Sequence, residues 1–392
     1  MVLDRREVVG AERDERYPLF HRARARTSVS QLAGDPGMRS LMVAAAIASG
    51  VCANANGQHA IRNWGDNYYG QCTAPITTDS VVAVDANWGY TLALIEDGSV
   101  RAWGYNGSGQ CTIPSDLGQC TAIAAGGWGH VIALRTDGFV RAWGDNRYGQ
   151  LAIPTNLGPC TAIAAGGQHA LALRTDGTIR AWGSNGSGQC DAPPDTSSCT
   201  AIAAGQYFSA AILPDGTIRA WGYNGYGQCS IPFATAGAAS IDCGYDHAIA
   251  LLQDGRVLAW GNNAYGQCNV PILLTSVNAI AAGGNISIAL KTDGTVRVWG
   301  DASTGVQSIP QYMPPVRKIA AGSFHVVAAT DPITCPCDLN RDGVVSGGDL
   351  GILLGAWGTA PHRPFPADLF GNGIVDGADV GLLLGAWGPC AN

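Results

Sequence analysis

The chain has 392 residues, of which 54 are glycine and 11 are tryptophan, and a formal net charge of −7. So much glycine suits many tight turns and favours an all-β body over a helical bundle. The acidic balance argues against sequence-independent binding to nucleic acid. A hydrophobic fraction of 46% excludes disorder over most of the chain. No apolar run is long enough to span a bilayer, and 13 cysteines indicate an oxidising compartment.

The N-terminal part has the pattern of an export signal. Residues 1–37 are charged and aperiodic, and we interpret them as a disordered or wrongly assigned leader. In residues 38–55, a basic start at Met38 precedes an apolar run and the small-residue motif Ala53-Asn54-Ala55, which is typical of a secretory signal peptide. We therefore predict cleavage after Ala55 and an extracellular or cell-surface location in a bacterium. The alternative is a buried helix in a cytosolic protein.

Residues 56–330 form an internal repeat. Trp-Gly pairs recur every 39 or 40 residues, and Asp-Gly pairs keep the same period. The tryptophans are Trp64, Trp103, Trp143, Trp182, Trp221, Trp260 and Trp299. A fixed period near 40 residues indicates stacked supersecondary units.

Each repeat unit has the pattern of short strands joined by turns. Between Ala162 and Gly183, leucine alternates with alanine over residues 170–173, which predicts a strand. Asp176-Gly177 then favours a two-residue hairpin turn, and a return strand ends at Trp182. With a further turn after the Trp-Gly pair, each unit is expected to hold about four short strands, as in one propeller blade.

The two ends of the repeat complement each other. The repeat begins with half a unit at residues 61–65 and ends with the other half at residues 318–329, with six complete units between them. Pairing of the two halves removes the open sheet edges. We therefore predict an all-β, seven-bladed β-propeller that is closed by its N- and C-terminal strands.

The consensus of the units is G-x-x-H-x-x-A-L-x-x-D-G-x-[VI]-x-x-W-G-x-N-x-x-G-Q. Over residues 57–330 this pattern resembles the repeat of the regulator of chromosome condensation family. Its short period is similar to that of secreted bacterial members, including a propeller that inhibits β-lactamase. The resemblance implies a propeller, and the family's roles include nucleotide exchange on a nuclear GTPase and chromatin binding.

Residues 331–392 carry a different pattern, with two units 30 residues apart. In the first unit, oxygen-bearing residues stand at positions 1, 3, 5, 9 and 12 of a loop, with a backbone carbonyl at position 7, as in an EF-hand calcium loop. These candidate ligands are Asp338, Asn340, Asp342, Val344, Ser346 and Asp349. The second set is Asp368, Asn372, Ile374, Asp376 and Asp379. Phe370 occupies its third position, so we expect weaker calcium binding there.

Each calcium loop is followed by a predicted short helix with one apolar face. These faces consist of Leu350, Leu353, Leu354 and Trp357, and of Val380, Leu383, Leu384 and Trp387. Paired loops with aspartate at the last position resemble a dockerin. That resemblance implies a small α-helical calcium-binding domain with a cohesin-like protein partner, in a family that tethers secreted and often polysaccharide-degrading proteins. The alternative is a calcium-stapled anchor without a cohesin partner.

Two residue types recur once per unit. We interpret the repeated histidines as structural residues that hydrogen-bond within their own blade, with a metal ring as the alternative; they are His130, His169, His247 and His325. An arginine stands two residues before most of the repeated tryptophans. Stacking of its guanidinium on the indole is the simpler interpretation, and an anion-binding ring is the other.

The cysteines fall in two columns of the repeat. Pairing of Cys111 with Cys120, and of Cys190 with Cys199, would close short loops within a blade. The alternative is a set of free, buried thiols. At the C-terminus, a bridge from Cys335 or Cys337 to Cys390 would clasp the calcium module.

No catalytic motif stands out, so we predict a non-enzymatic, monomeric, secreted protein that binds a protein or a glycan. The candidate contact residues precede a uniform strand of the repeat and are Trp88, Trp128, Tyr207, Phe208 and Tyr245. Their alternative role is to fill gaps between blades. The alternative functions are a component of extracellular polysaccharide degradation, including a hydrolase, and, on the family resemblance alone, a nucleotide exchange factor or an enzyme inhibitor.

Overall fold

The computed structural model describes residues 61–75, 80–233, 237–310, 313–330, 337, 339, 344–358, 367 and 374–389. All of them lie in the second of two compact units, Ala48–Asn392. The predicted leader and signal peptide lie outside the described residues.

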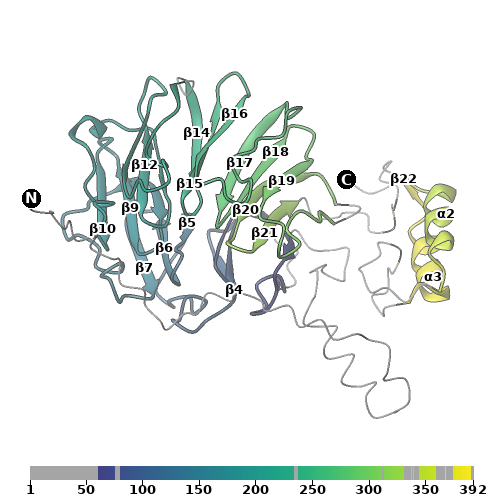
Figure 1. The fold of residues 1–392 in the computed structure, drawn as a ribbon. Coiled ribbons are helices and arrows are strands. Elements are labelled where there is room, and N and C mark those ends of the chain that lie inside the picture. The colour runs from purple at the N-terminus through teal and green to yellow at the C-terminus, as the bar shows by residue number, and fades with distance from the viewer. Residues whose placement is uncertain are drawn as a thin grey trace, which may run out of the picture. The chain divides into compact units, whose positions relative to one another are not determined.

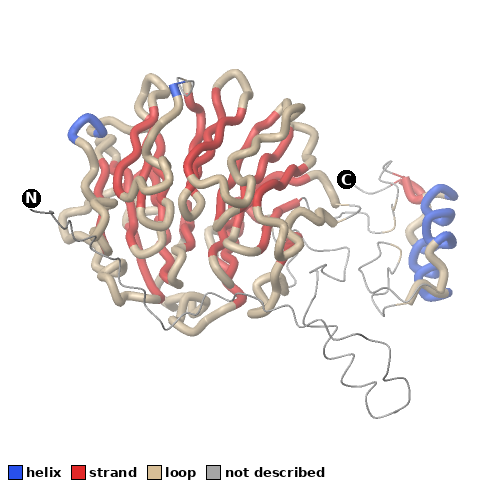
Figure 2. Tube along the Cα trace, in the orientation of Figure 1, coloured by secondary structure: helices blue, strands red, loops and turns tan. Residues whose placement is uncertain are grey.

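The repeat region consists of seven three-stranded antiparallel sheets (Figures 1 and 2). In chain order, the first is β2 (Val81–Asn87), β3 (Tyr90–Ile95) and β4 (Val100–Gly104); the second is β5 (Cys120–Ala125), β6 (His130–Arg135) and β7 (Val140–Gly144); the third is β8 (Cys160–Ala165), β9 (His169–Arg174) and β10 (Ile179–Gly183); the fourth is β11 (Ala201–Ala204), β12 (Phe208–Ile212) and β13 (Ile218–Gly222). The fifth is β14 (Ala238–Cys243), β15 (His247–Leu252) and β16 (Val257–Gly261); the sixth is β17 (Val277–Gly283), β18 (Ile286–Lys291) and β19 (Val296–Gly300). The seventh joins β20 (Val316–Ala321) and β21 (His325–Thr330) to β1 (Ile61–Gly65).

The seventh sheet confirms that the two half-units combine. Strand β1 pairs antiparallel with β21, with Trp64 opposite Val326 and Gly65 opposite His325. The expectation of about four strands per unit is wrong, since each sheet has three. After each Trp-Gly pair the chain turns instead, and in the first sheet the Asn106 side chain accepts a hydrogen bond from the Cys111 backbone N–H at 2.8 Å.

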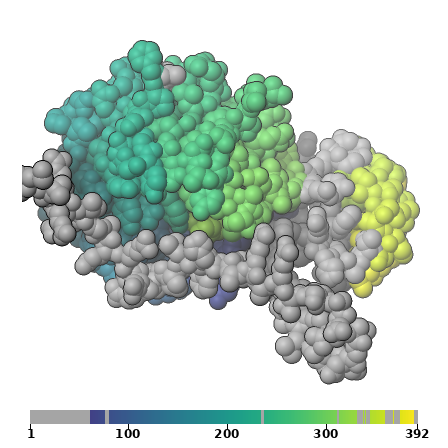
Figure 3. Space-filling model, viewed as in Figure 1, coloured from purple at the N-terminus to yellow at the C-terminus, as the bar shows by residue number. Residues whose placement is uncertain are grey.

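The middle strand of each sheet is the most deeply buried. All residues of β3 and β15 are buried, because neighbouring sheets pack on both of their faces. The hairpin to the outer strand turns at Asp-Gly, where Gly98 has a φ of +82° and the Asp97 carboxylate accepts the Ser99 N–H at 2.8 Å. Successive repeats pack side by side along the face seen in Figure 3.

The Trp-Gly pair joins each sheet to the one before it. The buried indole Nε1 donates to a backbone carbonyl in the loop of the preceding sheet, because a buried indole N–H needs an acceptor. These bonds are Trp103 to Gln71, Trp143 to Gln110, Trp182 to Gln150, Trp221 to Gln189, Trp260 to Gln228, Trp299 to Gln267 and Trp64 to Val306. Glycine follows because a Cβ at Gly104 would lie 2.5 Å from the Gly89 carbonyl oxygen. The seventh sheet is thus bonded to the first by the same indole hydrogen bond that joins the other neighbouring sheets.

The C-terminal module contains two helices, α2 (Gly347–Gly355) and α3 (Gly377–Gly385), and a two-residue ladder of β22 (Val344–Val345) with β23 (Gly388–Pro389). Leu353 and Leu383 are fully buried in its small core. The predicted apolar faces are too wide, since about half of each of four side chains is exposed: Leu354, Trp357, Leu384 and Trp387. The described helices are only nine residues long, so each buries a narrow stripe. No helix among the described residues is long and apolar enough to cross a membrane.

Candidate binding face and central cavity

A cavity of about 250 Å³ is lined by the innermost strands of all seven sheets. One position of these strands faces it in every repeat, and the side chain there is alanine in five sheets. In the first and fifth sheets it is an aspartate, Asp85 or Asp242. Neither aspartate was predicted from the sequence as a site residue, although an aspartate in a column of alanines is a visible signal.

The two aspartates bridge neighbouring sheets. Asp85 accepts the N–H of Ala125 in the second sheet at 2.8 Å, and Asp242 accepts that of Ala282 in the sixth at 2.8 Å. Burial raises the pKa of Asp85 to about 7 and that of Asp242 to about 6, although the backbone N–H donors oppose the shift. Among the described residues, no cluster of three or more His, Cys, Asp or Glu side chains suited to a metal ion occurs.

A chain of hydrogen bonds lies at one mouth of the cavity. The Tyr245 hydroxyl donates to Ser323 Oγ at 2.7 Å, Ser323 Oγ donates to Asn87 Oδ1 at 3.2 Å, and Asn87 Nδ2 donates to the Ala125 carbonyl at 3.0 Å. Burial raises the pKa of Tyr245 to about 12, so the phenol stays a neutral donor. Tyr245, a predicted contact residue, therefore links sheets across the mouth.

We define the loop face as the loops that follow the first and third strands of each sheet. The two loops of one sheet are joined by backbone hydrogen bonds, such as Tyr105 N–H to Gly89 O at 2.8 Å. Four aromatic rings from neighbouring loops pack there as the aromatic corner: Tyr68, Tyr69, Trp88 and Tyr105, with ring centroids 4.8–5.1 Å apart. Trp88 is part-buried within the corner, whereas Tyr68 is 81% exposed.

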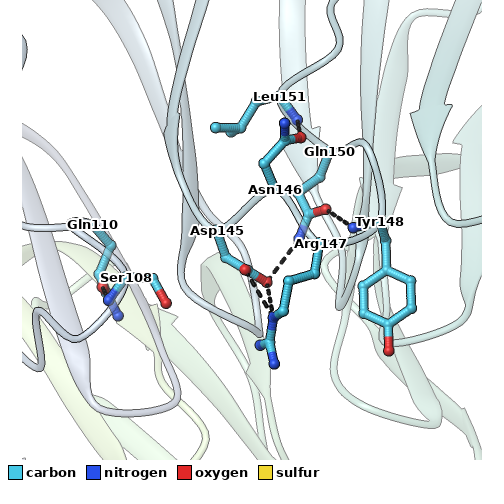
Figure 4. Close-up of polar contacts among 8 residues, drawn as sticks. All are labelled: Ser108, Gln110, Asp145, Asn146, Arg147, Tyr148, Gln150 and Leu151. Carbon is cyan, nitrogen blue, oxygen red and sulfur yellow. Dashed lines mark hydrogen bonds and ion pairs between the residues drawn. The ribbon is translucent and has the colours of Figure 1, made fainter.

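The predicted contact residue Trp128 belongs to a second group on the loop face. The Arg147 guanidinium lies 5.6 Å from the Trp128 ring centroid. Its Nε donates to the buried carboxylate of Asp145 at 2.9 Å, and Gln150 donates to the same carboxylate at 3.0 Å (Figure 4). The guanidinium is thus held between an indole and a carboxylate.

Two of the other sequence interpretations need correction. Phe208 is fully buried in β12, where it takes the place of the repeated histidine, so it cannot contact a ligand at the surface. Tyr207, beside it, is part-buried. Among the repeat arginines expected to stack on indole, Arg141 pairs with Asp116, and Arg219 pairs with Asp195 at 2.6 Å. A carboxylate in the preceding loop is the stronger partner for a guanidinium.

Three of the four repeated histidines bond between sheets and not within a blade, so that expectation was wrong for them. In each of the three, Nε2 lies 2.9–3.0 Å from a hydroxyl of the next sheet: His169 with Ser209, His247 with Ser287, and His325 with Thr91. The same hydroxyl donates to the carbonyl that accepts the tryptophan N–H, as Ser209 does to Gln189 at 2.8 Å. The last of these pairs again joins the seventh sheet to the first.

His130 lacks such a hydroxyl, because the equivalent residue of the next sheet is Ala170. We expect Ala170→Ser to stabilise the protein by about 1 kcal/mol by giving the buried imidazole a hydroxyl partner. The shift in midpoint of chemical denaturation would measure this. Ala248→Ser is the matched control, since Ala248 follows the sheet that carries Phe208; it should be neutral or destabilising. Equal effects of the two variants would contradict the prediction.

The predicted cysteine bridges within a blade are not formed. Cys111, Cys120, Cys190 and Cys199 are each free thiols, which contradicts the Cys111–Cys120 and Cys190–Cys199 pairings. The Cys111 sulfur instead donates to the carbonyl of Tyr105 at 3.2 Å, in its own loop. Burial raises the pKa of Cys111 to about 11, which keeps it a protonated, unreactive thiol. Cys335 and Cys390 lie outside the described residues.

The described half of each predicted calcium loop begins a helix. Asp349 and Asp379 are fully buried, and each accepts a backbone N–H at 2.8 Å, from Ser346 and Asp376 respectively. Val344 and Ile374, the predicted carbonyl ligands, stand at the same register of the two units. The remaining candidates, Asp338, Asn340, Asp342, Asp368 and Asn372, lie outside the described residues.

Comparison with known proteins identifies the repeat. Six segments match the regulator of chromosome condensation (RCC1) repeat: residues 81–110, 120–150, 160–189, 199–228, 238–267 and 277–305. The chain therefore carries six RCC1 repeats in a propeller-like fold, and the seventh sheet is assembled from segments outside them. A search of curated proteins finds no match.

Solved structures of the same fold are distant in sequence. Prp20p from Saccharomyces cerevisiae is 18% identical, with a TM-score of 0.59 over 72% of this chain and 93% of that one. Human WBSCR16 is 19% identical, with a TM-score of 0.57 over 66% and 88%. The ectodomain of the receptor kinase CR4 from Physcomitrella patens is 21% identical, with a TM-score of 0.54 over 65% and 72%. At such identities the likeness concerns the fold.

Proposed function

We propose that this chain is a non-enzymatic, secreted binding protein whose RCC1-type propeller recognises a protein through its loop face. The observation that carries the proposal is the concentration of aromatic side chains there. Tyr68, Tyr148, Tyr226 and Tyr265 are each at least 41% exposed, and the part-buried indoles of Trp88 and Trp128 belong to loops of the same face. Tyrosine, tryptophan and arginine are the residues enriched at the energetic centres of protein interfaces.

The fold supports a rigid platform for these loops. We infer that the seven sheets close into a ring, because the seventh bonds to the first through Thr91 and Trp103 as other neighbours do. A ring holds loops that are distant in sequence at fixed separations, which lowers the entropy cost of binding. The yeast relative Prp20p is described with binding properties to Gsp1p and histones, so a propeller of this kind can bind proteins.

Site-specific crosslinking tests the proposed face. A photoreactive phenylalanine analogue would replace Tyr226 on the loop face or Phe139 in an Asp-Gly hairpin at the opposite end; both side chains are 54% exposed. We expect proteins of the native secretome to crosslink through position 226 and not through position 139. Crosslinking through position 139 alone, or to carbohydrate alone, would contradict the proposed function.

We further propose that the C-terminal module binds calcium and anchors the protein, either on a cohesin-like partner or without one. The described residues fit a cation, since the fully buried carboxylates of Asp349 and Asp379 stand at the last ligand position of each loop. Burial of a carboxylate is costly unless hydrogen bonds or a cation compensate its charge.

Calcium removal tests this module. We expect a chelator to lower its unfolding temperature, because a ligand at a hundred times its Kd stabilises by about 2.7 kcal/mol. Asp349→Asn keeps the acceptor for Ser346 N–H but loses charge, so it should abolish most of the calcium effect. Asp379→Asn, in the loop that lacks one ligand, should have the smaller effect. Scanning calorimetry with and without calcium measures both, and an unfolding temperature independent of calcium would refute the site.

A further inference from the structure

Two of the seven loops that follow the Trp-Gly pairs share one arrangement, in which an aspartate is hydrogen-bonded to a glutamine five residues later. We call this segment the frame. Residues 66–71 read DNYYGQ and residues 145–150 read DNRYGQ. In both, the glutamine donates to the aspartate, at 2.9 Å from Gln71 to Asp66 and at 3.0 Å from Gln150 to Asp145. The same glutamine accepts the backbone N–H of the tyrosine two residues before it, Tyr69 at 2.9 Å and Tyr148 at 2.8 Å. The carboxylate of each loop is therefore held in the same way.

The two frames differ at the residue that neutralises the carboxylate. In the second sheet Arg147 pairs with Asp145 and lies over Trp128. In the seventh sheet the equivalent residue is Tyr68, whose ring extends into solvent. Among the described residues, the Asp66 side chain accepts one hydrogen bond, from the neutral Gln71, and forms no ion pair. Its charge is left without a counter-charge, next to the aromatic corner.

We propose that Asp66 and the aromatic corner form a docking site for an arginine or lysine side chain of the protein partner. The chain's own Arg147 shows which chemistry this frame accepts: a planar cation held between a carboxylate and an aromatic ring. The wider charge is complementary, since the described residues of the loop face include Asp66, Asp145, Asp246 and Asp301 and one basic residue, Arg147. A sugar would bind less well here, because three of the four ring pairs are edge to face and the fourth, Tyr69 with Trp88, is tilted by 39°, so the rings present no flat platform.

This inference rests on the proposed protein-binding role, and it is tested with defined probes. Fluorescein-labelled dodecapeptides of glycine and serine, carrying three arginines, three lysines, three glutamates or no charge, would be titrated with the full chain by fluorescence anisotropy. Cellohexaose and laminarihexaose would serve as the carbohydrate competitors. We expect the arginine peptide to bind most tightly and its affinity to fall as salt rises.

Three variants make the test specific. Asp66→Asn should weaken arginine-peptide binding about tenfold, as expected for the loss of an interface hot spot. Tyr68→Arg should abolish it, because the new side chain would occupy Asp66 as Arg147 occupies Asp145. Glu96→Gln removes an exposed charge at the opposite end of the first sheet and should leave the affinity unchanged. Circular dichroism and thermal unfolding confirm that each variant is folded.

The outcomes separate this inference from the proposed function. Affinity unchanged by Asp66→Asn and Tyr68→Arg, or equal affinity for the uncharged peptide, would overturn the cation site. So would tighter binding of the oligosaccharides. If crosslinking through position 226 still captures a protein in that case, the loop face remains the binding surface and only the chemistry of the partner is different.

Discussion

Replacing Trp64 by alanine should lower the free energy of unfolding by about 3–5 kcal/mol, the usual cost of truncating a buried aromatic side chain. Trp64 is completely buried, and its Nε1 donates to the Val306 carbonyl at 2.7 Å. It also packs in one cluster with Ile288 of the sixth sheet and Val326 of the seventh. A single residue near the start of the repeat thus holds β1 in the seventh sheet and ties that sheet to the sixth.

The midpoint of urea denaturation, followed by tryptophan fluorescence and circular dichroism, measures this effect. Trp64→Phe is the control for volume: it keeps most of the packing but removes the indole donor, so it should cost about 1–2 kcal/mol. A Trp64→Ala protein with an unchanged denaturation midpoint would show that β1 contributes little to the fold, and would remove the support for a seventh sheet built from both ends.

Acid should unfold the repeat region through its four buried histidines. Burial lowers the pKa of His130 and His247 to about 4 and that of His169 and His325 to about 3. An unfolded histidine titrates near 6.5. Their contribution to stability is therefore complete above pH 6.5 and is lost as the pH falls towards 3–4. At pH 4.5 the loss is about 2–3 kcal/mol for each histidine, which over four sites rivals the whole stability of a domain.

The chain supplies its own acid-insensitive replacement for one of these sites. Phe208 and Ala248 occupy the places of histidine and hydroxyl in another pair of sheets, with both side chains fully buried. The double variant His169→Phe with Ser209→Ala copies that arrangement. We expect it to change stability little at pH 7.5 and to gain about 2–3 kcal/mol relative to the unaltered chain at pH 4.5.

Denaturation midpoints measured between pH 4 and 8 test the histidine prediction. Asp85 affects stability with the opposite sign. Because burial raises its pKa to about 7, protonation of Asp85 adds stability that is complete below pH 3.8 and is lost as the pH rises through 7. Asp85→Asn should therefore make the acid-induced loss of stability steeper. Equal pH profiles for the double variant and the unaltered chain would contradict the assignment of acid unfolding to histidine.

Much of the fold was predictable from the period of the repeat. Seven units and the union of residues 61–65 with the last strands follow from the Trp-Gly and Asp-Gly positions, and the register of Trp64 with Val326 confirms that union. The hydrogen-bond partners of the histidines were not predicted from the sequence, although the sequence contains a signal for them. A serine follows His169 and His247 after 40 residues, at Ser209 and Ser287, where His130 is followed by Ala170.

The candidate site was predictable only in part. Trp88 and Trp128 do lie on the loop face, but their packing partners Tyr69, Tyr105 and Arg147 stand in loops that sequence spacing does not relate to them. The predicted cysteine pairs were wrong for a similar reason. Spacing placed Cys111 near Cys120 along the chain, whereas the Cys111 side chain turns towards the Tyr105 carbonyl of its own loop.

The sequence alone established the repeat, its strands and turns, and the sheet shared by the two ends, because these depend on local patterns and on which residues are equivalent. Only the packing of sheet against sheet decided which hydroxyl His169, His247 and His325 meet, and that two aspartates line the cavity. It also decided that, among the described residues, Asp145 pairs with a cation whereas Asp66 does not. The period of the repeat shows which residues occupy equivalent positions in successive units. It does not say whether a side chain turns to its own sheet or to the next, since that depends on the twist and separation of neighbouring sheets.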